Sequence, residues 1–552
     1  MRKIYLVLLA ILSGALLSLA WPARGFPFLM FIGFIPLLYI EDYIGKNRHN
    51  FTRSSAFLLS YIAFFVWNLL TSWWIVYSSV FGVCMAVVFN SMFMAIVFHL
   101  YHMIRRNLFK SRGGFFILVF FWITFELLHL DWDLSWSWLN LGNAFASWPH
   151  VVQWYEYTGV FGGDVWILAV NILLYKMLLS MFGSIRSRDR AIVLSVGTFL
   201  LLAGPIAFSE MKYYTYVEKE NPVDVVVVQP NIDPYNEKFN GMSTEEQLNK
   251  ILRMSREKLD KNTDYLVCPE TAIPEGLVED RLEQTISFDS LKALIHDFPK
   301  LKIVIGISSF KIYRDGEKPS PTARHSEAGD YWFDVCNSGL FLDSTYKAQI
   351  YHKSKLVPGV EMMPFPKIFG PLSEFAIDLG GMTGSNATQE ERTALGPVKG
   401  GIKVASVICY ESIYGEFVTG YVRNGANIIT ILTNDGWWEN TAGHRQHMQY
   451  ARLRAIETRR SIARSANTGT SCFIDQRGDV FQATNYWEDA VIRQTINANT
   501  GKTFYVRFGD YIGRFSFWVS CGVLLSYVVM LLLNKRKKIK IRLPHLKKKV
   551  AE

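Results

Sequence analysis

Val407-Ile408-Cys409-Tyr410-Glu411 places a cysteine at the carboxyl end of an apolar run that begins at Val404. A short run of this kind predicts a buried strand. In layered α/β domains, ligands commonly bind at the carboxyl ends of strands. A deprotonated thiol is the best side-chain nucleophile for an acyl group. A lone cysteine after an apolar run is more often a small core residue, so Cys409 indicates a site only if other groups accompany it.

Two upstream segments supply such groups. Leu266-Val267-Cys268-Pro269-Glu270-Thr271 places a carboxylate after a second strand-like run, where Glu270 would act as a general base. Tyr351-His352-Lys353-Ser354-Lys355-Leu356-Val357-Pro358 supplies an ammonium that would favour the thiolate and stabilise an oxyanion. By composition Lys355 is an equal candidate to Lys353, and both are surface residues unless the fold buries them.

Several alternatives stay open on composition alone. Glu275 competes with Glu270, although it follows a proline and looks more exposed. Glu361 and Glu411 would orient the lysine, hold a leaving group, or form structural ion pairs. His444 and His447 allow a Cys–His dyad, but no spacing links them to Cys409.

The region around these segments alternates strand-like and helix-like runs, which predicts a layered α/β domain. The expected strands are residues 224–229, 302–308, 338–342, 404–409 and 428–433, and the expected helices are residues 244–261, 289–297 and 445–459. Residues 314–330 indicate an exposed loop. Asn434-Asp435-Gly436-Trp437-Trp438 indicates a turn whose two exposed tryptophans touch lipid or, alternatively, a packed turn.

The rest of the chain is much more apolar. The protein has 552 residues, of which 50% are hydrophobic and 19% are charged. Eight segments are candidates for membrane spans, which need about 20 apolar residues each. They are residues 4–21, 26–40, 54–77, 80–103, 114–130, 159–181, 191–208 and 515–533. We therefore expect transmembrane helices 1–7 in residues 1–208, a catalytic domain in 209–514, an eighth span in 515–534 and a basic tail in 535–552.

Basic residues near the segment ends predict the orientation. They gather on one side of the expected membrane, at Arg2, Lys3, Lys46, Arg48, Arg53, Arg105, Arg106, Lys110, Arg112, Arg186, Arg188, Arg190 and the tail from Lys535 to Arg542. Both termini are then cytoplasmic, and residues 209–514 lie outside. A polybasic segment directly after a span favours anionic headgroups as its contact, so the net charge of +10 does not indicate nucleic-acid binding.

The six cysteines show neither a disulfide framework nor zinc-ligand spacing. We therefore expect no metal and no cofactor.

The order of CPETAIP, YHKSKLVP, VICYES and TNDGWW, at Glu270, Lys353, Cys409 and Asn434, resembles the nitrilase (carbon–nitrogen hydrolase) superfamily. The likeness extends to Gln229-Pro230-Asn231, to Asn337-Ser338 and to residues 452–467. Together with eight spans, it resembles the superfamily's membrane-bound branch, the bacterial apolipoprotein N-acyltransferases. The resemblance implies an external α-β-β-α sandwich joined to a helical transmembrane bundle.

The resemblance also implies roles for individual residues. Glu270 is the general base, Lys353 stabilises the oxyanion and thiolate, and Cys409 is the nucleophile; the spacing to Leu356-Val357-Pro358 favours Lys353 over Lys355. Glu361, Tyr410 and Glu411 match supporting positions. Two departures from the family pattern are Pro358-Gly359-Val360, where Pro-Phe-Gly is common, and Phe239, where a tryptophan is expected.

The reaction implied is transfer of an acyl chain from a membrane phospholipid, through a cysteine thioester, to the α-amine of the diacylglyceryl-cysteine of apolipoproteins. The enzyme would be a monomer of the bacterial inner membrane with a periplasmic catalytic domain. Residues 360–370 would guide acyl chains. One alternative is a membrane-anchored amidase or hydrolase with the same three groups. Another is a transporter or scaffold, for which Asn90 and Glu126 are the polar candidates inside spans.

Overall fold

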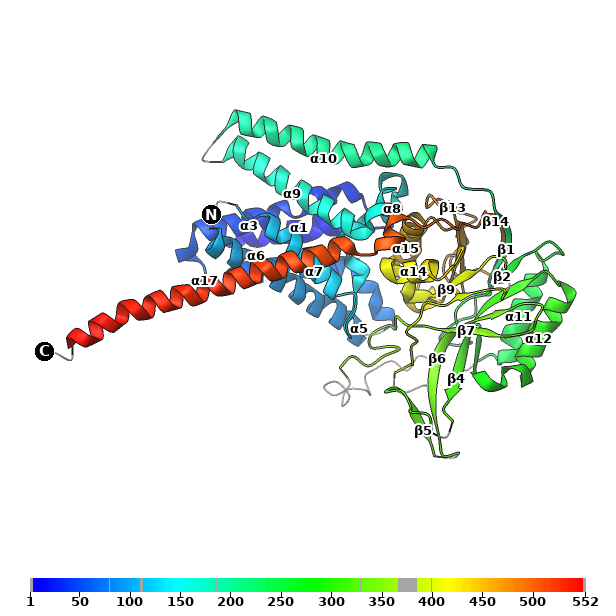
Figure 1. Ribbon diagram of the computed structural model, residues 1–552. Helices are drawn as coiled ribbons and strands as arrows, with labels where there is room; N and C mark the ends of the chain where they lie inside the picture. The colour runs from blue at the N-terminus through cyan, green and yellow to red at the C-terminus, as the bar shows by residue number, and fades with distance from the viewer. Residues whose placement is uncertain are drawn as a thin grey trace.

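A computed structural model describes residues 3–78, 80–109, 113–183, 186–239, 241–314, 316–327, 329–365, 385–398 and 400–549. Figure 1 shows a bundle of long helices on one side and two β-sheets with their covering helices on the other. The last helix, α17, runs back along the bundle and extends beyond it.

The bundle contains most of the helices that sequence predicts. Its main members are α1 (Lys3–Leu19), α2 (Met30–Gly33), α3 (Ile35–Lys46), α4 (Ser55–Ser72), α5 (Val80–Cys84), α6 (Asn90–Leu108), α7 (Phe116–Leu128), α9 (Val160–Phe182), α10 (Arg188–Thr215) and α17 (Tyr511–Lys549). Within the described ranges, six helical stretches are long and apolar enough to cross a membrane. The first and fifth predicted segments form the shorter apolar helices α1 and α7, of 17 and 13 residues.

Two predicted segments differ in detail from the structure. The fourth is not one regular helix, because a π-helical turn at Met85–Phe89 separates α5 from α6. Such turns leave the regular bonding ladder locally and often lie near functional sites. The eighth lies in α17, which continues through the basic residues after 533 to Lys549.

An ion-pair cluster joins α3 to α6 inside the bundle. Arg106 Nε donates to Glu41 Oε1 at 2.7 Å, and Arg105 Nη1 donates to Asp42 Oδ1 at 2.9 Å. All four residues are buried. Arg105 and Arg106, which the sequence analysis counts among the basic residues that set the orientation, are therefore paired with carboxylates, and losing one partner would leave a buried charge unpaired.

The described strands form two sheets. The eight-stranded sheet has the order β14-β1-β2-β4-β6-β5, with β3 paired to β4 and β7 paired to β6. Its strands are β1 (Pro222–Gln229), β2 (Tyr265–Val267), β3 (Ile273–Val278), β4 (Lys302–Ile312), β5 (Arg324–Ser326), β6 (Tyr331–Leu342), β7 (Gln349–His352) and β14 (Ala490–Asn497). The expected loop at 314–330 thus contains the short strand β5.

The six-stranded sheet has the order β13-β12-β11-β10-β9-β8. Its strands are β8 (Ala394–Leu395), β9 (Val404–Ile408), β10 (Ile428–Thr433), β11 (Ile462–Ala466), β12 (Cys472–Ile474) and β13 (Val480–Phe481). The central strands β9, β10 and β11 are parallel, so their carboxyl ends meet at one edge.

Alternation along β1 explains how the layers pack. Val225 and Val227 join a core with residues of the second sheet, whereas Val226 and Val228 pack against α11 (Thr244–Arg256) and α12 (Ile286–Asp297). Successive side chains of a strand point to opposite faces, so an uninterrupted valine run is buried on both. Helices α14 (Gly415–Arg423) and α15 (Ala442–Thr458) pack beside the second sheet.

The two halves of the molecule share one hydrophobic core. Tyr410, Ile413 and Tyr414, which directly follow Cys409, cluster with bundle residues such as Trp74 and Trp138. The Trp21 indole donates to the Tyr450 hydroxyl at 3.0 Å across the same interface. The segment that carries the cysteine is therefore held against the helical bundle.

Candidate active site

Three strand ends bring the predicted catalytic side chains together. Glu270 follows β2, Lys353 follows β7 and Cys409 follows β9. Their residues are 6%, 1% and 7% exposed, and all three line one cavity. Residues separated by up to 139 positions in the sequence thus meet in one site, as the sequence predicts.

Glu270 is held by donors from three segments. Lys353 Nζ and Asn337 Nδ2 donate to its Oε1 at 3.0 and 2.8 Å. The backbone N–H of Asn434, directly after β10, donates to Oε2 at 3.1 Å. These bonds fix the position of the carboxylate, a side chain that can serve as a general base. The rival Glu275 is exposed and accepts a hydrogen bond from Ser287 instead.

Lys353 lies between two carboxylates. Its Nζ donates to Glu270 at 3.0 Å and to Glu361 at 2.9 Å. Burial alone would lower the pKa of this ammonium, but the charges of Glu270 and Glu361 raise the pKa well above its ordinary value. Lys353 is therefore a permanent positive charge in a water-poor site, where its interaction with a developing oxyanion is strong.

Lys355, the other candidate, points elsewhere. Its Nζ donates to the backbone oxygen of Leu130 at 2.9 Å and pairs at 2.8 Å with Asp131, whose side chain is 92% exposed. The structure therefore separates the two lysines, which composition alone cannot do.

Cys409 occupies a sharp turn between β9 and the 3₁₀ segment Cys409–Ile413. Its φ of +48° lies in the left-handed region, which non-glycine residues adopt at a cost of about 1–3 kcal/mol and which is common at functional sites. Burial raises the pKa of the thiol, and Glu270 raises it further, whereas Lys353 lowers it. Lys353 thus favours the thiolate, as the sequence predicts, but burial and Glu270 outweigh it; the net pKa is above the ordinary value, so the resting thiol is neutral and needs a base.

Glu411 ties the ends of two strands together. Its carboxylate accepts from the backbone N–H groups of Ile408 and Ser354 at 2.8 and 2.7 Å and from the Tyr351 hydroxyl at 2.7 Å. Ile408 directly precedes Cys409, and Ser354 directly follows Lys353. Tyr410 instead donates to the Ser135 oxygen of the bundle at 2.9 Å. Both supporting residues thus position the site, and Glu411 makes no ion pair in the structure described.

The histidines do not form a dyad with the thiol. His447 Nε2 lies 3.1 Å from the Cys409 carbonyl oxygen and 2.9 Å from Ser412 Oγ, and its Nδ1 lies 2.9 Å from Asp435 Oδ1. His444 instead packs against the Tyr486 ring. The His447 network supports the backbone of the turn at Cys409, a role that its sequence spacing did not indicate.

Asp435 is the anionic centre of that network. Although burial would raise its pKa, Arg464 and His447 hold the pKa well below the usual range. A depressed folded-state pKa contributes stability that is present above the unfolded value of about 3.9 and is lost as pH falls below it. We expect Asp435→Asn to lower the free energy of unfolding by about 3–5 kcal/mol at pH 7.

Unfolding midpoints in detergent would measure this change at pH 7 and again below pH 4, where the difference from the parent should shrink. Asp489→Asn is the matched control, because its carboxylate pairs with Lys250 on the surface and is worth about 0–1 kcal/mol. Equal stability of the two variants at pH 7 would contradict the prediction.

Aromatic residues of the bundle form the opposite wall of the cavity. Trp74, Trp136, Trp138 and Phe93 all line it, from segments that sequence places in or between spans. Trp438 packs against Trp74 with ring centroids 5.0 Å apart. The turn at 434–438 is therefore a packed one, and its tryptophans face the cavity rather than standing exposed.

The two departures from the family pattern also reach this cavity. Phe239 stacks on Trp437 with centroids 6.4 Å apart, and Gly359 and Val360 line the wall beside Glu361. Of the predicted acyl guide at 360–370, Val360, Glu361 and Pro364 line the cavity, and residues 366–370 lie outside the described ranges.

Two further residues contact Glu270, one at its carboxylate and one at its backbone. Asn337 Nδ2 bridges Glu270 and Glu361, and Lys238 Nζ donates to the Glu270 backbone oxygen at 3.0 Å. Burial lowers the pKa of Lys238 to about 8, and Glu270 opposes that shift. The sequence analysis names Asn337 only as part of the Asn337-Ser338 pair and assigns it no role. The only signal for Lys238 was its position beside Phe239.

A buried carboxylate, ammonium and thiol at the strand ends of a two-sheet domain can together form and break a thioester. The chain belongs to the carbon–nitrogen hydrolase family, whose family model matches residues 225–504. A second model, for the apolipoprotein N-acyltransferase N-terminal domain, matches residues 13–173.

Curated relatives extend over nearly the whole length. An apolipoprotein N-acyltransferase of Chlorobaculum tepidum is 28% identical over 91% of this chain and 93% of its own. One of Geobacter metallireducens is 28% identical over 91% of each chain. Among solved structures, Saccharomyces cerevisiae Nit3, a member of branch 10 of the nitrilase superfamily, is 15% identical with a TM-score of 0.35, covering 51% of this chain and 93% of its own.

Proposed function

We propose that this protein is an apolipoprotein N-acyltransferase, which moves an acyl chain from a membrane phospholipid to the α-amine of a diacylglyceryl-cysteine. The observation that carries the proposal is the position of Glu270, Lys353 and Cys409 in a cavity whose other wall comes from the helical bundle. Both family models and the full-length relatives support it.

In the first half-reaction, Cys409 Sγ attacks the ester carbonyl carbon of the phospholipid as Glu270 takes the thiol proton. Lys353 and a backbone N–H near Tyr410 stabilise the tetrahedral oxyanion. The carbon–oxygen bond then breaks, and the proton held by Glu270 passes to the departing lysophospholipid oxygen. The acyl chain is then bound to Cys409 as a thioester.

In the second half-reaction, the neutral α-amine of the acceptor attacks the thioester carbon. Glu270 accepts the proton that the amine loses and returns it to the departing sulfur, which restores the resting thiol. The neutral resting state of Cys409 agrees with this cycle, because the same carboxylate takes and returns the proton.

The membrane context follows from the composition of the bundle. We place eight spans in the bilayer by adding α1 and α7 to the six longer stretches, with α-β-β-α layers in residues 209–514. The catalytic domain then lies on the periplasmic side of a bacterial inner membrane and both termini are cytoplasmic. The apolar wall lined by Trp74, Trp136 and Phe93 would receive acyl chains directly from the lipid.

The acceptor distinguishes this function from its alternative. Purified protein should convert phospholipid with a labelled acyl chain and a synthetic diacylated lipopeptide into an amide-linked triacylated product. A membrane-anchored hydrolase with the same three groups would release only labelled fatty acid, because water would resolve the thioester. Fatty acid as the sole labelled product, at equal rates with and without the lipopeptide, would refute the transferase.

The hypothesis of a transporter or scaffold rests on Asn90 and Glu126, two polar residues inside the expected spans. Asn90 donates to Asn68 at 2.8 Å, and Glu126 accepts from the Trp122 indole and the Leu141 N–H. Asn90 Nδ2 and Glu126 Oε1 therefore have hydrogen-bond partners among the described residues.

A further inference from the structure

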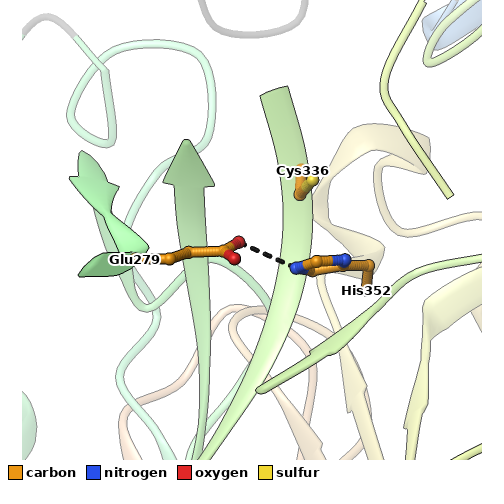
Figure 2. A group of neighbouring side chains, drawn as sticks. All are labelled: Glu279, Cys336 and His352. Atoms are coloured by element: carbon orange, nitrogen blue, oxygen red, sulfur yellow. Dashed lines mark hydrogen bonds and ion pairs between the residues drawn. The ribbon is translucent and has the colours of Figure 1, made fainter. Parts of the chain in front are cut away.

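A second cluster of chemically reactive side chains lies beside the candidate active site. Glu279 follows β3, Cys336 lies on β6 and His352 ends β7. One carboxylate oxygen, the thiol sulfur and one imidazole nitrogen all lie within 4.8 Å of one another. Figure 2 shows the three side chains converging from separate elements, with the Glu279–His352 bond drawn between them.

The three groups are connected to a supporting residue. His352 Nε2 lies 2.7 Å from Glu279 Oε1, and Ser309 Oγ donates to the same oxygen at 2.8 Å. Cys336 supplies the sulfur of the cluster; it is 2% exposed and its thiol is free. The side chains of Glu279 and His352 are 17% and 16% exposed. The Glu279–His352 side of the cluster is therefore partly exposed to solvent.

Thiolate, imidazole and carboxylate together are the ligands of a borderline-soft divalent cation, above all Zn²⁺. In tetrahedral zinc sites with bond lengths of about 2.0–2.3 Å, ligand atoms stand about 3.3–3.6 Å apart. Moving the Glu279 and His352 atoms apart by roughly 0.6–0.9 Å from their present 2.7 Å, and moving both closer to the sulfur, would reach that spacing. Ser309 already holds the carboxylate, as supporting residues do for metal ligands.

We propose that Glu279, Cys336 and His352 form a binding site for Zn²⁺, with a fourth position left to water. Binding breaks the Glu279–His352 hydrogen bond, and the thiol proton of Cys336 passes to solvent as the metal–sulfur bond forms. The competing explanation is a simple imidazole–carboxylate pair beside a core thiol, and it is an outcome of the test below.

The location gives the site its interest. Cys336 directly precedes Asn337, which bridges Glu270 and Glu361, and His352 directly precedes Lys353. An ion bound here would fix the two strands that carry these groups, one residue away from each. The inference stands on the cluster alone and does not depend on which acyl acceptor the enzyme uses.

The test uses the full chain without added affinity-tag histidines, in detergent, stripped with a chelator. Titration with Zn²⁺ against a chromophoric competitor should show one tight ion per chain. Glu279→Gln, Cys336→Ser and His352→Ala should each weaken that binding at least tenfold. Co²⁺ in place of Zn²⁺ should give a thiolate-to-cobalt absorption band in the parent that is missing from Cys336→Ser.

Two variants serve as matched controls. Cys268→Ser changes another buried free thiol, directly after β2, and His325→Ala removes an imidazole that pairs with Asp330 at 3.1 Å outside the cluster. Both should bind zinc as the parent does. Parent protein that binds no more zinc than Cys336→Ser, or controls that lose binding equally, would overturn the proposal in favour of the simple pair. If His352→Ala does not fold, the near-isosteric Glu279→Gln and Cys336→Ser still decide the question.

Discussion

Cys409→Ser should abolish N-acylation, with a fall in kcat of roughly 10⁴-fold or more, as removal of a nucleophile does elsewhere. The hydroxyl is a much weaker nucleophile than sulfur, and the site is arranged to remove a proton from a thiol. The variant should fold and insert as the parent does, because the change replaces one buried atom by a smaller one. The rate is measured with labelled phospholipid and diacylated lipopeptide.

Folding of this variant is checked by its elution in detergent and its unfolding midpoint. The matched control is Cys472→Ser, another buried free cysteine of the same sheet, which should keep its acylation rate. If the Cys409→Ser variant still formed a thioester with the labelled acyl chain, Cys409 would not be the nucleophile.

Lys353→Ala should be far more damaging than Lys355→Ala. The first change leaves the buried Glu270 carboxylate and the partly buried Glu361 carboxylate without their shared cation, which costs about 3–5 kcal/mol of stability. It also removes an oxyanion partner, worth roughly 10²–10³ in kcat. The second breaks a pair with exposed Asp131, worth about 0–1 kcal/mol.

Paired unfolding and acylation measurements on the two variants separate these effects. Lys353→Met is a useful third variant, since it keeps most of the volume while removing the charge, and it should lose activity as Lys353→Ala does. The reverse order of damage would mean that the wrong lysine has been placed in the site.

Much of the site could be predicted because its chemistry is local in sequence. Glu270, Lys353 and Cys409 each follow a recognisable apolar run, and strand ends of a layered domain meet. The rest depends on tertiary contacts. Nothing in its neighbourhood distinguishes His447 from other helical histidines, yet its imidazole reaches the Cys409 carbonyl oxygen from α15.

The fold shows the same division. The valine run of β1 predicts a strand buried on both faces, and the structure has one. Hydropathy could not show that Arg105 and Arg106 are neutralised by Glu41 and Asp42, because those partners lie more than 60 residues away. Nor could it reveal the π-helical turn at Met85–Phe89, since composition does not report local hydrogen-bond register.

The shared packing of Tyr410, Ile413 and Tyr414 with bundle residues bears on how the enzyme can be handled. A soluble fragment that begins at residue 209 would lack the helical bundle, so the apolar side chains that follow Cys409 would be exposed to water. An exposed apolar surface of this kind favours aggregation, and the turn at Cys409 would lose the contacts that hold it. We therefore expect the excised domain to be inactive. Reconstitution of the intact polypeptide, rather than truncation, is the route to kinetics.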